Sequence, residues 1–241
     1  MFNFHKIFKF SEALVGRRCA ICSVVLEEFG PGIILCDGCQ NNLAQRLGGF
    51  CAMCGNVYAL EDDATYLCTR CRTSPFSWSA LSFYSVYQGL LKDIILRYKF
   101  SADLGLGQVL GNLLSAAAAR HPYEFMDLII PVPLHDLRLK HRGFNQSFEL
   151  CRILGKKINL PVCRQALIKI RHTPAQSLMS RKERLENIKN VFHACPDTIK
   201  EKKILLVDDI MTTGSTLEEC SKTLLGSGAA EVRVVVLARA V

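Results

Sequence analysis

Apolar residues recur along the last two thirds of the chain in two alternating patterns. Helix-like periodicity spans 88–119, and its second part, 104–119, is apolar enough to form a buried helix. Compact apolar runs, typical of buried strands, occupy 128–132, 166–170, 204–207 and 232–237. Because strands that alternate with helices form parallel sheets covered by helices, the pattern predicts an α/β fold from about residue 79 onward.

The first third of the chain is organised around cysteine pairs. The spacing C-x2-C-x13-C-x2-C occurs twice, with a shift of 32 residues. Two C-x-x-C loops can give one tetrahedral ion a closed shell of four thiolates, as in zinc ribbons. The repeat therefore predicts two structural Zn²⁺ sites in sequential order, formed by Cys19, Cys22, Cys36 and Cys39 and by Cys51, Cys54, Cys68 and Cys71.

Other uses of these cysteines are open at this point. The alternatives are one zinc site with a relic second repeat, a cross-braced pairing, disulfide bonds and an iron–sulfur cluster. Regular, closely spaced pairs suit a metal better than long-loop bridging, and a closed shell has no position left for catalysis. We expect a double zinc-finger domain at 1–78 and a second domain at 79–241, with Phe76 and Trp78 packing at the junction.

Composition excludes several classes of protein. Of the 241 residues, 49% are apolar and 22% are charged, which is too apolar for a disordered chain and too mixed for a membrane bundle. No stretch is apolar for long enough to span a bilayer, so no membrane insertion is expected. His5, Lys6 and Lys9 interrupt the N-terminal apolar residues where a secretory signal needs an unbroken core. We therefore expect a cytoplasmic protein.

The segment with the most chemical information is 204–216. Its four apolar residues predict a buried strand that ends at Asp208 and Asp209, and a loop of small residues then opens a helix at 217–225. Backbone N–H groups at a helix N-terminus bind phosphate, and Gly214 lets the backbone approach it. Paired carboxylates beside such a loop can accept hydrogen bonds from vicinal ribose hydroxyls. The loop also carries hydroxyl donors, namely Thr212, Thr213, Ser215 and Thr216. Together, the paired acids, the helix N-terminus and these hydroxyls predict a 5-phosphoribose site.

This segment resembles the phosphoribosyl diphosphate (PRPP) motif of type I phosphoribosyltransferases. The G-x4-G-K pattern of a P-loop is absent. A transferase that releases diphosphate must neutralise its charge with Mg²⁺, loop amides and basic side chains. Two basic segments can supply those side chains, and for 181–189 the alternative is a solvated amphipathic helix. The catalytic candidates are Asp208, Asp209, Arg142, Arg171 and Arg184.

From Cys19 to its end, the chain resembles the ComF family, also called the GntX-like family. The motifs that carry the resemblance are the C-x-x-C pairs, Tyr98-Lys99-Phe100, Pro131-Val132-Pro133-Leu134, Arg142-Gly143-Phe144-Asn145-Gln146, R-x-T-x-x-Q from Arg171, and D-D-x-x-T-T-G-x-T from Asp208. The resemblance implies a cytoplasmic competence protein with a zinc finger and a type I phosphoribosyltransferase domain, which handles single-stranded DNA in natural transformation.

The same resemblance implies roles for individual residues. Asp208 and Asp209 would hold the ribose hydroxyls, and 171–187 would match a mobile loop that closes over the site. The diphosphate would lie beside the loop at 131–134, which would contribute Val132 and Pro133 to PRPP binding. The 5-phosphate would bind at Met211, Thr212, Thr213, Gly214, Ser215 and Thr216.

Three hypotheses of function follow from these motifs. The first is an enzyme, in which PRPP bound with Mg²⁺ loses diphosphate to an acceptor that the sequence does not identify. The second is a non-catalytic module that senses PRPP or binds a DNA phosphate and links single-stranded DNA to DNA-uptake or recombination proteins. The third is a structural zinc-ribbon adaptor, which leaves 204–216 unexplained.

The net charge of +8 belongs entirely to the second part of the chain. Residues 1–80 carry seven basic and seven acidic side chains, whereas 81–241 carry 23 and 15. Between Arg138 and Lys189 there are 13 basic residues and only three glutamates. Positive charge concentrated beside the predicted PRPP motif is explained first by diphosphate and second by DNA.

Overall fold

A four-stranded parallel sheet forms the centre of the computed structural model, which describes residues 17–26, 35–58, 65–101, 103–120, 123–171 and 190–241. In space the strands follow the order β1-β6-β5-β2, and every pairing between them is parallel. This confirms the α/β fold that the apolar pattern predicts, and it adds β1, which the pattern does not mark. The strands are β1 (Ala80–Val86), β2 (Leu128–Pro131), β5 (Lys203–Met211) and β6 (Glu231–Arg239).

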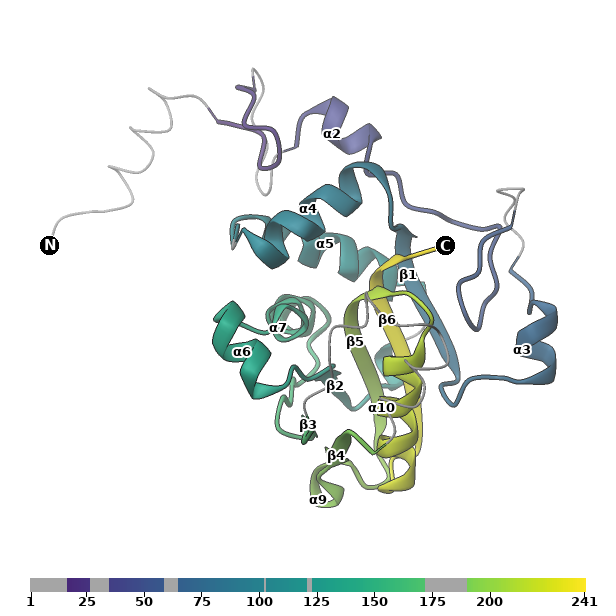
Figure 1. Cartoon of the computed structure of the whole chain (residues 1–241). Helices are drawn as coiled ribbons and strands as arrows, with labels where there is room; N and C mark the ends of the chain where they lie inside the picture. The colour runs from purple at the N-terminus through teal and green to yellow at the C-terminus, as the bar shows by residue number, and fades with distance from the viewer. Residues whose placement is uncertain (1–16, 27–34, 59–64, 102, 121–122, 172–189) are drawn as a thin grey trace, which may run out of the picture.

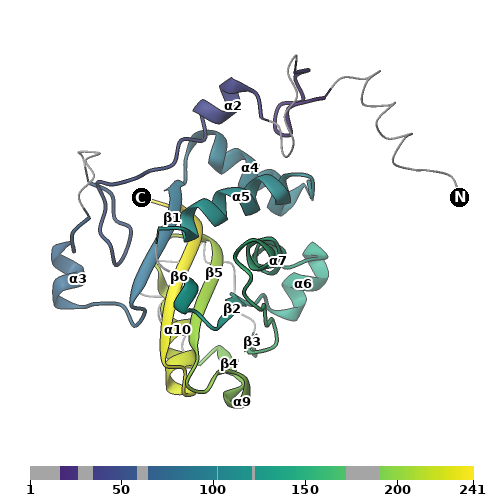
Figure 2. The same cartoon turned by 180° about the vertical axis from the view of Figure 1, so that it is seen from behind.

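Helices cover both faces of this sheet (Figures 1 and 2). On one face, α5 (Leu106–Ala118) and α7 (Gln146–Ile158) pack on each other and on the strands, and α4 (Gly89–Phe100) packs on α5. The opposite face carries α10 (Ser215–Gly226). Successive strand residues point to opposite faces, so Leu206 joins the hydrophobic cluster under α10 and Val207 joins the cluster under α5 and α7.

The helical stretch 88–119 consists of two helices. Ser101 ends α4, and α5 begins after Gly105. Leu106, Leu110 and Leu114 of α5 are fully buried, which confirms the buried helix predicted within 104–119. No helix in the described ranges is long and apolar enough to cross a membrane.

The apolar run at 166–170 does not join the central sheet. Its strand, β3 (Leu167–Lys169), pairs antiparallel with β4 (Phe192–Ala194), and the expectation of another parallel strand there was wrong. Ile168 and Ile170 are exposed, whereas Leu167 is fully buried, so this run has the one-sided burial of a surface strand. The remaining elements are the 3-10 helix η1 (Tyr123–Phe125), α6 (Asp136–Arg142) and α9 (Pro196–Ile199).

The two cysteine-rich repeats attach to opposite faces of the sheet. The first, with α2 (Asp37–Asn41), places Cys19 and Cys39 in the hydrophobic cluster of α4, α5 and α7. The second, with α3 (Thr69–Thr73), places its cysteines in the cluster that β1, β6 and α10 share. Trp78 is 1% exposed and the Phe76 ring stacks on it with centroids 4.1 Å apart, which confirms their expected packing role. The domain boundary at residue 78 stays a prediction.

Candidate functional site

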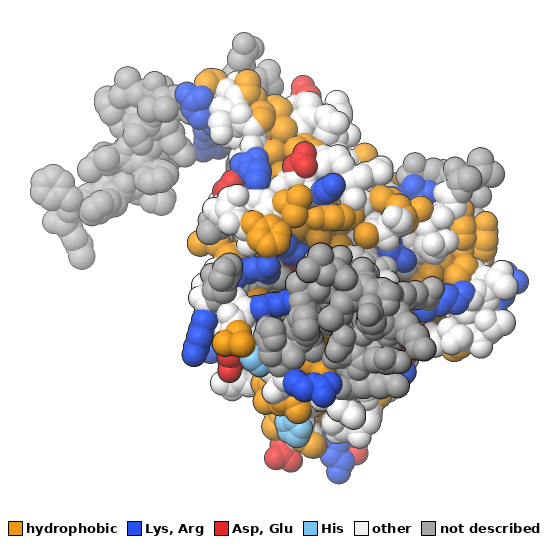
Figure 3. All heavy atoms as spheres, viewed as in Figure 1, with side chains coloured by type: hydrophobic (Ala, Val, Ile, Leu, Met, Phe, Trp, Pro, Cys, Tyr) orange, Lys and Arg blue, Asp and Glu red, His pale blue; other side chains and the backbone are white. Residues whose placement is uncertain are grey.

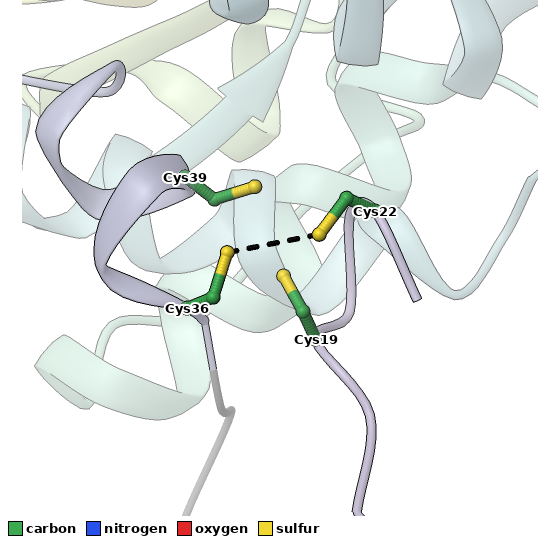
Figure 4. A group of neighbouring side chains, drawn as sticks. All are labelled: Cys19, Cys22, Cys36 and Cys39. Atoms are coloured by element: carbon green, nitrogen blue, oxygen red, sulfur yellow. Dashed lines mark hydrogen bonds between the residues drawn. The ribbon is translucent and has the colours of Figure 1, made fainter. Parts of the chain in front are cut away.

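The eight paired cysteines form two clusters in sequential order, as the repeat predicts. Within each cluster the four sulfur atoms lie within 4.8 Å of one another. A Zn–S distance of about 2.3 Å in a tetrahedral shell separates sulfurs by about 3.8 Å. Cys22 Sγ and Cys36 Sγ are 3.6 Å apart, and Cys54 Sγ and Cys68 Sγ are 3.8 Å apart. Figure 4 shows the four sulfurs of the first cluster turned toward a common centre, so both donor sets fit Zn²⁺.

The internal repeat extends to the backbone around these cysteines. Ser23 and Gly55, each directly after the second cysteine of a pair, both adopt a left-handed φ of 64° and donate N–H groups to the carbonyls of the first cysteine. Cys36 and Cys68 each precede a short helix as its N-cap residue. Two loops of the same shape, each closed on four thiols, indicate structural metal knuckles.

A cavity of about 440 Å³ lies at the carboxyl ends of β2 and β5, where open α/β sheets bind their ligands. The structure brings most of the site residues predicted from the sequence into its lining. Arg171 is exposed and is absent from this lining, and Arg184, with the rest of 172–189, lies outside the described residues. The predicted residues in the lining are Arg142, Val132, Pro133, Asp208, Asp209, Met211, Thr212, Thr213, Gly214, Ser215 and Thr216.

The paired acids lie within β5 instead of ending it. Asp208 pairs in the sheet with Val236, and the ladder continues to Met211 opposite Arg239, so the predicted strand end at the acids was wrong. Residues that follow one another in a strand point to opposite faces. The two carboxylates therefore have different surroundings, although they are adjacent in sequence.

Asp209 is 4% exposed, and its Oδ2 forms an ion pair of 2.8 Å with Lys99 Nζ from the end of α4. Asp208 Oδ1 accepts hydrogen bonds from Ser147 Oγ and from the Asp209 N–H, both at 2.9 Å. Burial and the neighbouring charge of Asp209 raise the pKa of Asp208 to about 7, although Lys99 opposes that rise. Asp209 is thus paired with a lysine, and the pKa of Asp208 lets this second acid change its charge near neutral pH.

The loop after β5 has the form expected of a phosphate cradle. Gly214 is the N-cap of α10 and has a φ of 82°, a conformation in which other residues are strained. A Cβ at Gly214 would lie 2.7 Å from Met211 Cε. The hydroxyls of Thr213 and Ser215 are 2.8 Å apart at the start of the helix. The N-terminus of a twelve-residue helix and these hydroxyls together offer donors and positive potential to an anion.

The R-G-F-N-Q motif builds another wall of the cavity. Arg142 ends α6, Gly143 turns the chain with a φ of 83°, and Asn145 caps α7. The Asn145 amide donates to the Val132 carbonyl at 3.2 Å, which ties the motif to the loop after β2. Arg142 Nη1 donates to Gln146 Oε1 at 2.6 Å, and burial lowers the pKa of Arg142. The motif therefore positions a partly buried cation at the cavity.

Several cavity residues escape prediction from the sequence. Lys99 lies in the quoted Y-K-F segment, but nothing in that segment indicates that it pairs with Asp209. Ser147 follows the R-G-F-N-Q motif directly and bonds Asp208. Arg138 and Lys169 belong to the basic stretch 138–189 and add positive charge to the lining, although neither is among the predicted site residues; burial together with Arg138 lowers the pKa of Lys169 to about 8. Figure 3 shows Lys and Arg side chains gathered on the left and lower parts of the face in view.

Comparisons with known proteins identify relatives over most of the chain. The family described as Phosphoribosyl transferase domain matches residues 145–240. Competence protein F of Haemophilus influenzae is 33% identical, over 92% of this chain and 97% of its own length. DNA utilization protein YhgH of Escherichia coli K12 is 32% identical, over 87% and 97%. Competence protein ComFC of Bacillus subtilis is 28% identical, over 83% and 81%.

Among solved structures, the glutamine PRPP amidotransferase from B. subtilis aligns with 52% of this chain and 24% of its own, at 20% identity and a TM-score of 0.36. The domain match covers α7, β5, α10 and β6, which supply the paired acids and the phosphate loop. Residues 145–240, which supply the paired acids and the phosphate loop of the cavity, therefore match a phosphoribosyltransferase domain.

Proposed function

Because the chain belongs to the competence protein F family and carries a phosphoribosyltransferase domain, we propose that it binds PRPP, as the Mg²⁺ complex, and acts in the uptake and processing of single-stranded DNA. The proposal includes transfer of the phosphoribosyl group to an acceptor with release of diphosphate. Relatives named for competence and for DNA utilization support the DNA part. The cavity at the carboxyl end of the sheet supports the PRPP part.

One juxtaposition carries the PRPP proposal. Asp208 and Asp209 share a single cavity with the loop that opens α10, and its volume of about 440 Å³ suits a small ligand. A phosphate monoester at the loop would be held by backbone N–H groups and by the Thr213 and Ser215 hydroxyls. The carboxylates would then accept hydrogen bonds from the ribose hydroxyls.

The basic side chains of the cavity suit the leaving group. Arg138, Arg142 and Lys169 line the cavity together with Pro133 and Leu134 of the loop after β2. Cations held in partly buried positions stabilise negative charge on a departing diphosphate more strongly than cations in bulk water. Transfer needs no nucleophile on the protein, because positioning and charge stabilisation assist the departure of diphosphate from the sugar.

In this proposal, Mg²⁺ enters the cavity bound to the substrate. Asp209 Oδ2 is already paired with Lys99, and Asp208 Oδ1 accepts two hydrogen bonds, so a metal ion at these two oxygens would compete with existing partners. Mg²⁺ prefers phosphate oxygens and water with only one or two carboxylates. The ion would neutralise the diphosphate with which it enters.

A non-catalytic use of the same cavity is the second candidate. The relatives over most of the chain are named for competence or DNA utilization, and none of the three quoted names mentions an enzymatic reaction. In this alternative the chain senses PRPP, or binds a DNA phosphate at the same loop, and links single-stranded DNA to uptake or recombination proteins. A fold alone does not decide between turnover and binding.

Two measurements on the full chain test the proposal. PRPP with Mg²⁺ should raise the melting temperature, and diphosphate release should be followed with a panel of bases, amines and single-stranded DNA. Replacing Asp208 and Asp209 by Asn should abolish the thermal shift, whereas Asp197→Asn, an exposed change on α9, should keep it. If PRPP still raises the melting temperature of the double variant, the assignment of these two acids to the ribose hydroxyls is wrong. If PRPP raises the melting temperature but no mixture releases diphosphate, the chain senses PRPP and is not a transferase.

The DNA part is tested by charge neutralisation. Binding of a single-stranded oligonucleotide should weaken with rising salt, because phosphate contacts release counterions. If the basic segment 181–189, which lies outside the described residues, contacts DNA, neutralising Lys182 and Arg184 should weaken binding more than neutralising Arg17 and Arg18 near the first cysteine cluster. The reverse order would assign DNA binding to the cysteine-rich part.

A further inference from the structure

One arginine connects the second cysteine cluster with the phosphate loop. Arg239, at the end of β6, donates from Nε to the carbonyl of Cys54 at 2.8 Å. Its Nη1 donates to the carbonyls of Met211 at 3.3 Å and Thr212 at 2.5 Å, where the loop begins. A planar guanidinium fixes its acceptors in a defined relative geometry. The backbone of one C-x-x-C pair and that of the loop are thus joined through a single side chain.

Aromatic packing makes a second connection between the same two parts. A Cβ placed on Gly214 would lie 3.2 Å from the Phe76 ring, so this ring covers the loop glycine. Phe76 stacks on Trp78, and Trp78 Nε1 donates to the Met53 carbonyl at 2.8 Å. Met53 lies between the cysteines of the second cluster's first pair.

A third connection holds the first turn of α10. Ser77 donates from its N–H and from its hydroxyl to the two carboxylate oxygens of Glu218, both at 2.9 Å. Met211 and Leu217, on either side of the loop, belong to the same hydrophobic cluster as Cys51, Cys54 and Cys71. Three kinds of contact therefore link the second cysteine-rich repeat, or the segment 76–78 that follows it, with the loop and the first turn of α10.

The first repeat offers a matched comparison. Arg97 of α4 donates to the Ile21 carbonyl at 2.9 Å, at the place in the first repeat that corresponds to Met53 in the second. Arg97 Nη2 pairs with Asp103 Oδ2 at 2.7 Å. Each repeat thus has an arginine on its C-x-x-C backbone, but Arg239 also holds the phosphate loop.

We propose that the second four-cysteine site holds the phosphate loop of the phosphoribosyl site in place, and that Arg239 is the residue that positions the loop. The first four-cysteine site has no such role. A metal on Cys51, Cys54, Cys68 and Cys71 would fix the knuckle backbone. Arg239 and Phe76 then hold the loop, and its amides stay aimed at a bound phosphate. The identity of that phosphate as PRPP rests on the proposed function, whereas the coupling of knuckle and loop does not.

The test compares Arg239→Met with Arg97→Met in the full chain. Both variants should keep the wild-type zinc content, because neither residue is a ligand. Amide hydrogen exchange across 211–216 without ligand should accelerate in R239M only. PRPP affinity should fall by about tenfold or more in R239M, because charge-assisted hydrogen bonds are lost. R239K should recover part of the affinity, and R97M should bind as the wild type does.

A second pair of variants tests the metal directly. Cys71→Ser and Cys22→Ser should each lose about one zinc per chain, but only C71S should accelerate exchange at 211–216. Equal loop exchange in R239M and wild type would overturn the inference, as would equal acceleration in R239M and R97M. Faster exchange in R239M together with no PRPP binding by the wild type would sustain the coupling and remove the proposed ligand. If exchange at 211–216 is unchanged in R239M and the wild type binds PRPP, the coupling is wrong and the proposed ligand stands.

Discussion

Replacing Asp208 by Asn is expected to stabilise the folded chain increasingly from about pH 4 to about pH 7, while it weakens PRPP binding. Asp208 lies within the central sheet, and its Oδ1 accepts hydrogen bonds from Ser147 and from the Asp209 N–H. An Asn side chain keeps an acceptor for both donors, but it cannot ionise. The substitution therefore removes one partly buried charge and leaves these two hydrogen bonds in place.

The magnitude follows from the raised pKa of Asp208, which moves from 3.8 to about 7 through burial and the charge of Asp209. The unfolded chain releases this proton near pH 4 and the folded chain near pH 7, so rising pH between these values favours unfolding. Each pKa unit corresponds to about 1.4 kcal/mol. Ionised Asp208 thus lowers the free energy of unfolding by at most about 4 kcal/mol, and D208N avoids that loss.

Urea unfolding of the wild type and D208N between about pH 4.5 and 8 measures the effect. The difference in unfolding free energy should grow in favour of D208N as pH rises, and it should level off above about pH 7. The exposed change Asp197→Asn is the control and should show no such trend. A difference that stays flat or falls with pH would refute the reasoning, because the carboxylate would then be as well solvated in the fold as outside it.

Two further predictions follow from the geometry. Gly214→Ala should lower stability by about 1–2 kcal/mol in urea unfolding and weaken PRPP binding, because φ is 82° and the new Cβ would lie 2.7 Å from Met211 Cε. Gly226→Ala in the same helix, with nothing within 4 Å of its Cβ, should be neutral or stabilising, and equal costs at both positions would contradict the argument. Metal analysis should give about two zinc per chain; about one would mean that only one cysteine cluster closes a site.

Patterns that are local in sequence predict much of this protein. The cysteine spacing predicts both clusters and their sequential pairing, because a C-x-x-C loop brings its two thiols together whatever surrounds it. The paired acids and hydroxyl-rich loop at 208–216 predict the cavity for the same reason, since one strand and the helix after it carry every member. The run at 166–170 was assigned to the wrong sheet because an apolar run does not specify its pairing partner: β3 joins β4 instead of the central sheet.

The two cysteine knuckles, the α/β alternation and the strand–loop–helix segment that binds phosphate in the proposal could all be predicted from sequence, because residue types and their spacing along the chain are enough to recognise each of them. The pairing of Lys99 with Asp209 and the link that Arg239 makes between the second knuckle and the loop become visible in the folded chain alone. These contacts exist because parallel strands bring their carboxyl ends, and the segments that follow them, to one edge of the sheet. Residues distant in sequence meet there, and no local pattern encodes that meeting.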